Sequence, residues 1–191
     1  MSAFEKKIES IRKAYAAGLY EPALALVLTL PDICAEIEFP SIDKVGDRYI
    51  KWSNNHIFQD NPSNNKGNFS GAALYQLRCH FLHNGNSDLF KDKGNADSRV
   101  FISKFELMLP KDESDNSTEL LMKSMTWKDD QTQEEFYTVQ MNIRNIIDEI
   151  CNATEEFYED WPTKDSFEDH SIQLIEYNEE TLEQVKLEIV P

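Results

Sequence analysis

Side chains that can act on a phosphate group lie close together in the segment LRCHFLHNG, residues 77–85. Arg78 can hold a phosphate through two hydrogen bonds, and a histidine can take up or release a proton near neutral pH. Cleavage of RNA by its own 2'-hydroxyl needs a proton carrier and a cation beside the transition state. The pattern therefore suggests His83 as the acid/base, Arg78 as the phosphate clamp and His80 as a helper one turn before His83.

A structural explanation of the same residues is equally open. His83 stands before an Asn-Gly pair, which commonly ends a helix, and the helix dipole favours a histidine in the last turn. Arg78 can instead pair with a nearby carboxylate, for which Asp32 and Glu36, predicted on one face of a helix, are candidates. His80 and His83 also form a possible metal pair, but no third ligand is evident nearby. We therefore predict no metal and no cofactor.

The segment from 70 to 84 is predicted to be a helix that is apolar on two sides. Ser70 is suited to cap it, and a second apolar stripe lies opposite the core face. Arg78 and His83 flank the second stripe, roughly 140° apart around the helix and about 7.5 Å apart along it. A second copy of the chain could cover this stripe and bring both pairs into one cleft. The core stripe holds Leu74, Leu77 and Phe81, and the predicted dimer interface holds Tyr75, Cys79 and Leu82.

Helical patterns also fill the chain before this segment. Residues 3–19 place apolar side chains at helical spacing, and residues 21–39 are predicted to form a buried helix that is kinked at Pro31. A third helix is predicted within residues 41–58. The inward-facing residues are Phe4, Ile8, Ile11, Tyr15 and Leu19 in the first helix and Val45, Tyr49 and Trp52 in the third.

Arg78, four intervening residues and His83 resemble the Arg-x4-6-His motif of the HEPN superfamily. The order of helices over about residues 4–90 is also similar to that superfamily, whose members include ribonuclease toxins and phage-defence proteins. The resemblance implies a helical core, a homodimer formed across the motif helices, and a composite site that cuts RNA without a metal.

The pattern changes after the motif helix. We predict a β hairpin over 98–127, a long closing helix over 132–161 and a C-terminal tail over 162–191 with a short strand at 170–177. The predicted fold class is therefore mainly α, a HEPN-like helical bundle with a small β appendage and a long C-terminal helix. We treat residues 1–191 as a single domain.

The charge of the chain is unevenly distributed. Residues 110–191 contain 22 acidic and 6 basic side chains, whereas residues 1–109 are balanced, so the whole net charge of -16 lies in the C-terminal part. Because such a field repels phosphate, RNA binding is expected through residues 1–109, while residues 110–191 could dock a basic protein. The three widely spaced cysteines and the lack of a long apolar run predict a cytoplasmic protein without a membrane segment.

Two functions remain open from the sequence. The first is a homodimeric, HEPN-like endoribonuclease of a defence or toxin type that needs no metal. The alternative is a non-catalytic interaction module on the same fold, with the acidic part as its docking surface.

Overall fold

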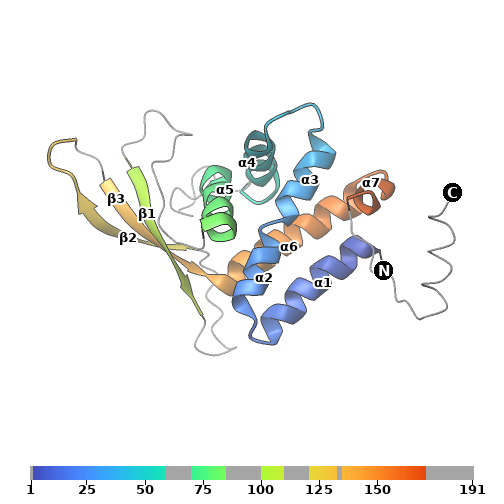
Figure 1. The fold of residues 1–191 in the computed structure, drawn as a ribbon, viewed down its shortest axis with the longest axis horizontal. Coiled ribbons are helices and arrows are strands. Elements are labelled where there is room, and N and C mark those ends of the chain that lie inside the picture. Colours follow the sequence, from blue (N-terminus) through green and yellow to red (C-terminus); the bar gives the residue numbers. More distant parts are fainter. Residues whose placement is uncertain (1, 59–69, 85–99, 110–120, 133–134, 171–191) are drawn as a thin grey trace, which may run out of the picture.

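The chain forms a helical body that carries a small β-sheet on one side (Figure 1). A computed structural model describes residues 2–58, 70–84, 100–109, 121–132 and 135–170. The mainly helical fold with a small sheet, predicted from the sequence, is confirmed. The predicted strand at 170–177 lies outside the described residues except for His170, and so do residues 59–68 and 85–95.

The first helix, α1 (Ala3–Ala16), is fixed at its start by a capping box. The Ser2 side chain accepts a hydrogen bond from the Glu5 N–H at 3.1 Å, and the Glu5 carboxylate accepts one from the Ser2 N–H at 2.6 Å. The helix stops before Gly18, whose φ of 76° is a left-handed conformation that suits glycine. Leu19, predicted on the apolar face, therefore lies beyond the helix and is exposed.

The single kinked helix predicted over 21–39 is instead two helices, α2 (Tyr20–Val27) and α3 (Leu30–Glu38). Pro31 stands in the first turn of α3, where the missing N–H of proline leaves no helical hydrogen bond unmade. Proline thus begins a new helix here rather than bending an existing one.

Helices α4 (Val45–His56) and α5 (Gly71–Cys79) pack closely against each other. The Gly71 N–H donates to Asn54 Oδ1 at 2.8 Å, and a Cβ atom at Gly71 would lie 2.5 Å from the Ile50 carbonyl oxygen. The Ser70 cap is confirmed, since its hydroxyl accepts from the Ala73 N–H. Tyr49 and Trp52 are buried as predicted, but Val45 is exposed because it is the first residue of α4.

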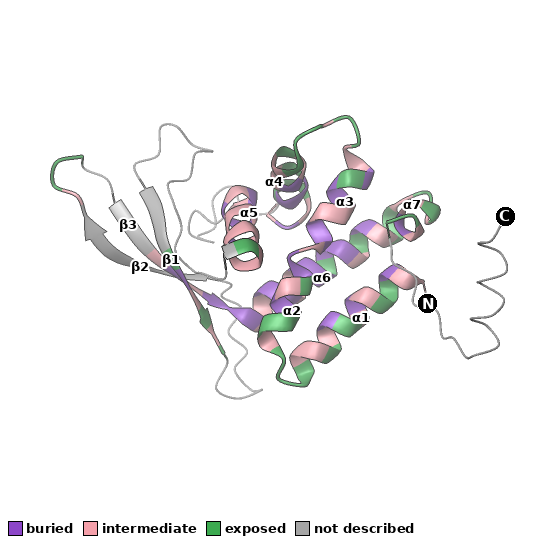
Figure 2. Ribbon diagram, in the orientation of Figure 1, coloured by how far each residue is buried: buried purple, intermediate pink, exposed green. Residues whose placement is uncertain are grey.

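Helix α6 (Ile143–Asp160) runs through the centre of the body and contacts α1, α2, α3 and α4. Its buried side chains recur at helical spacing and form the centre of the core seen in Figure 2. A short helix, α7 (Asp165–Glu168), follows it. The buried residues of α6 are Ile143, Ile146, Ile147, Ile150, Cys151, Ala153, Thr154 and Phe157.

The sheet has three strands, β1 (Val100–Met108), β2 (Leu121–Lys128) and β3 (Glu135–Asn142), in the order β1-β3-β2. Strand β3 pairs parallel with β1 and antiparallel with β2. The two strands predicted within 98–127 are present as β1 and β2, but their predicted pairing as a hairpin is wrong, because they lie on opposite sides of β3. The predicted closing helix over 132–161 is also wrong in its first part, which is β3.

Strand β3 joins the sheet to the helical body. It ends at Asn142, whose side-chain oxygen accepts from the Arg144 and Asn145 N–H groups and caps α6. Val139 and Met141, two residues apart, are buried, so one face of the end of β3 extends the core of α6.

Candidate functional site

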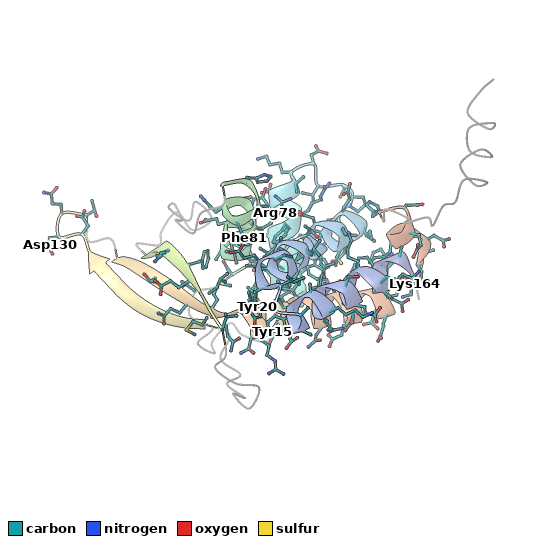
Figure 3. All side chains as sticks on the ribbon, turned by 60° about the horizontal axis from the view of Figure 1, so that its bottom comes forward. Tyr15, Tyr20, Arg78, Phe81, Asp130 and Lys164 are labelled. Atoms are coloured by element: carbon teal, nitrogen blue, oxygen red, sulfur yellow. The ribbon has the colours of Figure 1, made fainter. Side chains whose placement is uncertain are left out.

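Arg78, at the end of α5, is held by Asp32, in the first turn of α3. Arg78 Nε and Nη2 each lie 2.9 Å from Asp32 Oδ2. The two side chains are only 18% and 21% exposed. The carboxylate pairing that the sequence left open is thus present, and it joins two helices that are distant in the chain. Figure 3 labels Arg78 on the side-chain view.

The helix that carries Arg78 continues as a π-helical turn, η1 (His80–Asn84). A π-helical turn makes its hydrogen bonds between residues i and i+5, so a residue five positions on returns to nearly the same face. Arg78 Nη1 accordingly lies 3.4 Å from His83 Nε2. The separation of roughly 140° was predicted for a continuous α-helix, whereas η1, which begins at His80, is wound more loosely than an α-helix. The two groups of the proposed motif meet within one chain.

The Arg78–His83 contact also specifies the state of the imidazole. Arginine has no acceptor, so Nη1 donates and His83 Nε2 accepts, which places the proton of a neutral His83 on Nδ1. The His83 side chain is exposed, and its ring can therefore reach a ligand in solution.

The Asp32–Arg78 pair is largely shielded from solvent. Burial raises the pKa of Asp32, and the attraction of Arg78 lowers it without offsetting the burial. Burial lowers the pKa of Arg78, but the Asp32 carboxylate outweighs that effect and the pKa is raised. Arginine keeps its charge at any accessible pH. Asp32 Oδ1 is buried and has no hydrogen-bond partner.

The three residues of the predicted dimer interface are each partly exposed. Tyr75 packs within its own chain, because its ring lies 5.3 Å from that of Tyr49 and a Cβ at Gly46 would lie 2.8 Å from it. Cys79 Sγ lies 4.0 Å from Arg78 Nη1, and Leu82 is partly buried in η1. The stripe is therefore already covered in part by α4, and its use as an interface between two copies stays a prediction.

His80 is the first residue of η1 and is partly buried, and its role as a helper stays a prediction. Among the described residues, no group of three or more histidine, cysteine, aspartate or glutamate side chains is arranged to hold a metal ion. The three cysteines are free, and burial raises the pKa of Cys151 to about 12, so this thiol is protonated at neutral pH.

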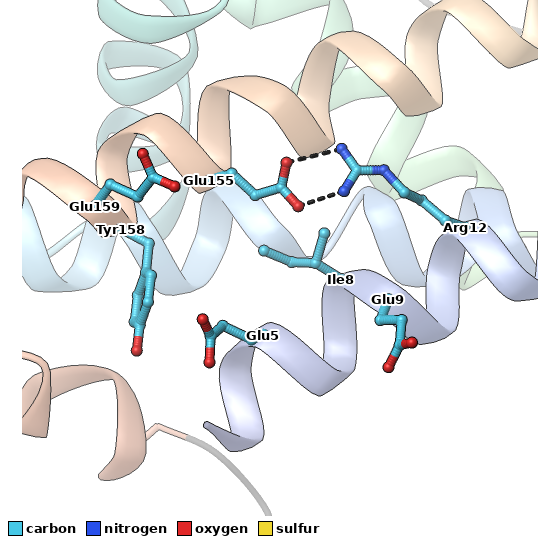
Figure 4. Close-up of a pocket in the computed structure, with 7 residues that line it drawn as sticks. All are labelled: Glu5, Ile8, Glu9, Arg12, Glu155, Tyr158 and Glu159. Atoms are coloured by element: carbon cyan, nitrogen blue, oxygen red, sulfur yellow. Dashed lines mark hydrogen bonds and ion pairs between the residues drawn. The ribbon is translucent and has the colours of Figure 1, made fainter. Parts of the chain in front are cut away.

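A second feature is a pocket of about 300 Å³ between α1 and α6 (Figure 4). Its charged lining contains four carboxylates and one guanidinium. Arg12 makes a two-pronged ion pair with Glu155 and also donates to Asn152 Oδ1 at 2.9 Å. The pocket is thus acidic, because Arg12 balances the charge of only one of its four carboxylates, Glu155. The residues that line it are Glu5, Ile8, Glu9, Arg12, Glu155, Tyr158 and Glu159.

No protein-family model, curated protein or solved structure matches this chain. The resemblance of residues 4–90 to the HEPN superfamily accordingly stays a prediction based on Arg78 and His83. Within the part of the chain that the structure describes, no helix has the length and apolarity needed to span a membrane.

The site differs from the sequence-based expectation in one element, the π-helical turn. Asp32 is one of the carboxylates that the sequence offers as a partner of Arg78, but it lies 46 residues away, so spacing alone does not reveal which carboxylate forms the pair. The π-helical turn was not predicted, because the apolar stripe through Phe81 fits an α-helix equally well.

Proposed function

We propose that the chain is a HEPN-like endoribonuclease of a defence or toxin type, which acts as a homodimer and needs no metal. The observation that carries this proposal is the 3.4 Å contact between Arg78 Nη1 and His83 Nε2 on a π-helical turn. Single π-helical turns are frequent at functional sites, and the proposal is supported by a guanidinium beside an imidazole at this one.

The chemistry follows from the two side chains. The Nη1 and Nη2 side of the Arg78 guanidinium remains open to a phosphate, because Asp32 takes Nε and only one N–H of Nη2. A phosphate that binds there draws Nη1 away from His83 and frees Nε2. His83 Nε2 then accepts the proton of the ribose 2'-hydroxyl, whose oxygen attacks phosphorus while the 5'-oxygen leaves and takes up a proton from water. The products are a 2',3'-cyclic phosphate and a 5'-hydroxyl end.

Incubation of the purified protein with a mixed-sequence, single-stranded RNA in excess EDTA tests this proposal. We expect cleavage to continue in EDTA, new ends to carry a cyclic phosphate and a 5'-hydroxyl, and the protein to sediment as a dimer. Cleavage that stops in EDTA, or products with a 5'-phosphate, would contradict the mechanism. An RNA that stays intact at all protein concentrations would reject the activity.

The acidic pocket between α1 and α6 favours a second candidate, the interaction module with an acidic docking surface. Its carboxylates include Glu9, which is paired with Lys13 at the surface, and Glu159, which is exposed. A lysine-rich segment of another protein suits such a pocket, because opposite charges attract it and the rim stays hydrated.

Binding of a fluorescent oligolysine peptide, measured at rising salt concentration, tests this candidate. We expect the Glu9→Gln/Glu159→Gln variant to bind several-fold more weakly at low salt than the unmodified chain. The matched control is Glu36→Gln/Glu106→Gln, which also removes two carboxylates, neither of which lines the pocket. Equal weakening by the control would show that only the net charge of the protein matters.

A further inference from the structure

The Asp32–Arg78 pair is more enclosed than an ordinary surface ion pair. Its side chains are 18% and 21% exposed, whereas those of the Lys13–Glu9 pair on α1 are 71% and 43% exposed. Exposed pairs contribute little and hold no fixed geometry, while an enclosed pair with two short contacts fixes the plane of the guanidinium. Asp32 therefore constrains Arg78 in a way that a solvated carboxylate does not.

The arrangement also decides where the rest of the guanidinium points. Both contacts from Arg78 go to Oδ2 of Asp32, and Oδ1 is left buried without a partner. An unpaired buried acceptor is unfavourable, so this geometry persists only because the surrounding helices impose it. With Nε and Nη2 held on the side of α3, Nη1 is directed toward His83.

We infer that Asp32 is a positioning residue: its carboxylate holds the Arg78 guanidinium so that Nη1 lies beside His83 Nε2. The catalytic meaning of this inference rests on the ribonuclease function proposed above. The contact between Arg78 Nη1 and His83 Nε2 does not rest on that function, since it is a property of the free protein. Asp32 touches neither the substrate nor the reacting atoms in this scheme and acts only through Arg78.

Two substitutions separate the hydrogen bonds of Asp32 from its charge. Asp32→Asn keeps an acceptor oxygen in the position of Oδ2 and has the same shape, but it has no charge. Asp32→Ala removes both. Positioning requires the acceptor, so the asparagine variant should retain the Arg78–His83 contact and the alanine variant should lose it. Glu36→Gln is the matched control, because Glu36 stands one turn further along α3 and makes only long ion-pair contacts, 3.8 Å to Arg48 and 3.9 Å to His170.

The first measurement is the ring nitrogen spectrum of His83 in protein labelled with 15N-histidine, assigned by comparison with His83→Gln. We expect Asp32→Ala to shift the Nε2 signal, because the donor from Arg78 is lost. Asp32→Asn and Glu36→Gln should leave it close to that of the unmodified chain. An unchanged Nε2 signal in Asp32→Ala, or an equal shift in Asp32→Asn, would overturn the inference. Circular dichroism establishes that each variant is folded.

The second measurement is RNA cleavage by the same variants. We expect Asp32→Ala to lower kcat by about 10²-fold with a smaller change in KM, and Asp32→Asn to recover most of that loss, because misplacing a reacting group by about 1 Å has an effect of this size. An unmodified chain that does not cleave RNA rejects the proposed function, while the spectrum still decides whether Asp32 positions Arg78. A shifted Nε2 signal with an unchanged kcat overturns the catalytic part of the inference.

Discussion

Alanine at His83 will lower RNA cleavage by about 10²–10⁴-fold, the range that a positioned general acid/base contributes. Alanine at Arg78 will lower it by about 10²–10³-fold, as expected when a group that stabilises the charge of the transition state is removed. The losses differ in kind, since the His83 variant still binds the phosphate while the Arg78 variant does not. We therefore expect KM to rise in Arg78→Ala and to stay nearly unchanged in His83→Ala. Steady-state cleavage of a labelled RNA gives both constants.

Arg78→Lys provides a sharper form of this test. Lysine keeps the positive charge, but its single ammonium group cannot hold Asp32 and face His83 as the planar guanidinium does. We expect Arg78→Lys to be nearly as slow as Arg78→Ala. The control is His170→Ala, which removes an exposed histidine whose Nδ1 lies 2.7 Å from the Ser166 carbonyl oxygen, far along the chain from the motif. Full activity in both the His83 and Arg78 alanine variants would reject the assignment of the site.

The helical body could be predicted from the sequence because a helix imposes a local and regular spacing on its apolar residues. Phe4, Ile8 and Ile11 on α1 and the isoleucines of α6 are buried as their spacing indicates. Ser70 caps α5 because its hydroxyl can reach an N–H three residues ahead, which is again a local effect. These features depend on neighbours within one or two turns and need no knowledge of the tertiary fold.

The sheet could not be predicted in the same way. Phe136, Val139 and Ile143 have helical spacing and suggested that the closing helix begins early, but Val139 and Met141 are buried at the spacing of two that a strand requires. Asn142 as a helix cap and the aromatic and β-branched residues before it were the available signals. The placement of β3 between β1 and β2 depends on pairings between distant segments, which no local spacing specifies.

The candidate site could likewise be predicted only in part. The identities of Arg78 and His83 and the option of a carboxylate partner came from residue types. Their contact involves the π-helical turn, and the anchor on Asp32 depends on how α3 and α5 both pack on α4. Residue types specify neither feature, so the sequence could name the groups but not their geometry.

Alanine at Trp52 will destabilise the protein by about 3–5 kcal/mol, the usual loss for a large buried aromatic side chain. Trp52 is fully buried on α4, stacks on His56 at a ring separation of 4.8 Å and meets the edge of Phe157 on α6 at 5.7 Å. His56 in turn contacts Glu38 on α3 at 2.8 Å. Loss of Trp52 therefore loosens three helices at once and leaves a large cavity between them. Urea unfolding followed by circular dichroism gives the free energy of unfolding.

Two related variants define the cause of that loss. Trp52→Phe should have a much smaller effect, because phenylalanine keeps much of the buried surface and removes an indole N–H that is buried without a partner. Trp161→Ala, at the C-cap of α6, should reduce stability less than Trp52→Ala, since Trp161 packs against the core but is only partly buried. Because α4 also supports α5 through Asn54 and Tyr49, we expect Trp52→Ala to lose RNA cleavage at temperatures where Trp161→Ala retains it. Equal unfolding midpoints for Trp52→Ala and Trp161→Ala would show that the contact between α4 and α6 does not hold the helical body together.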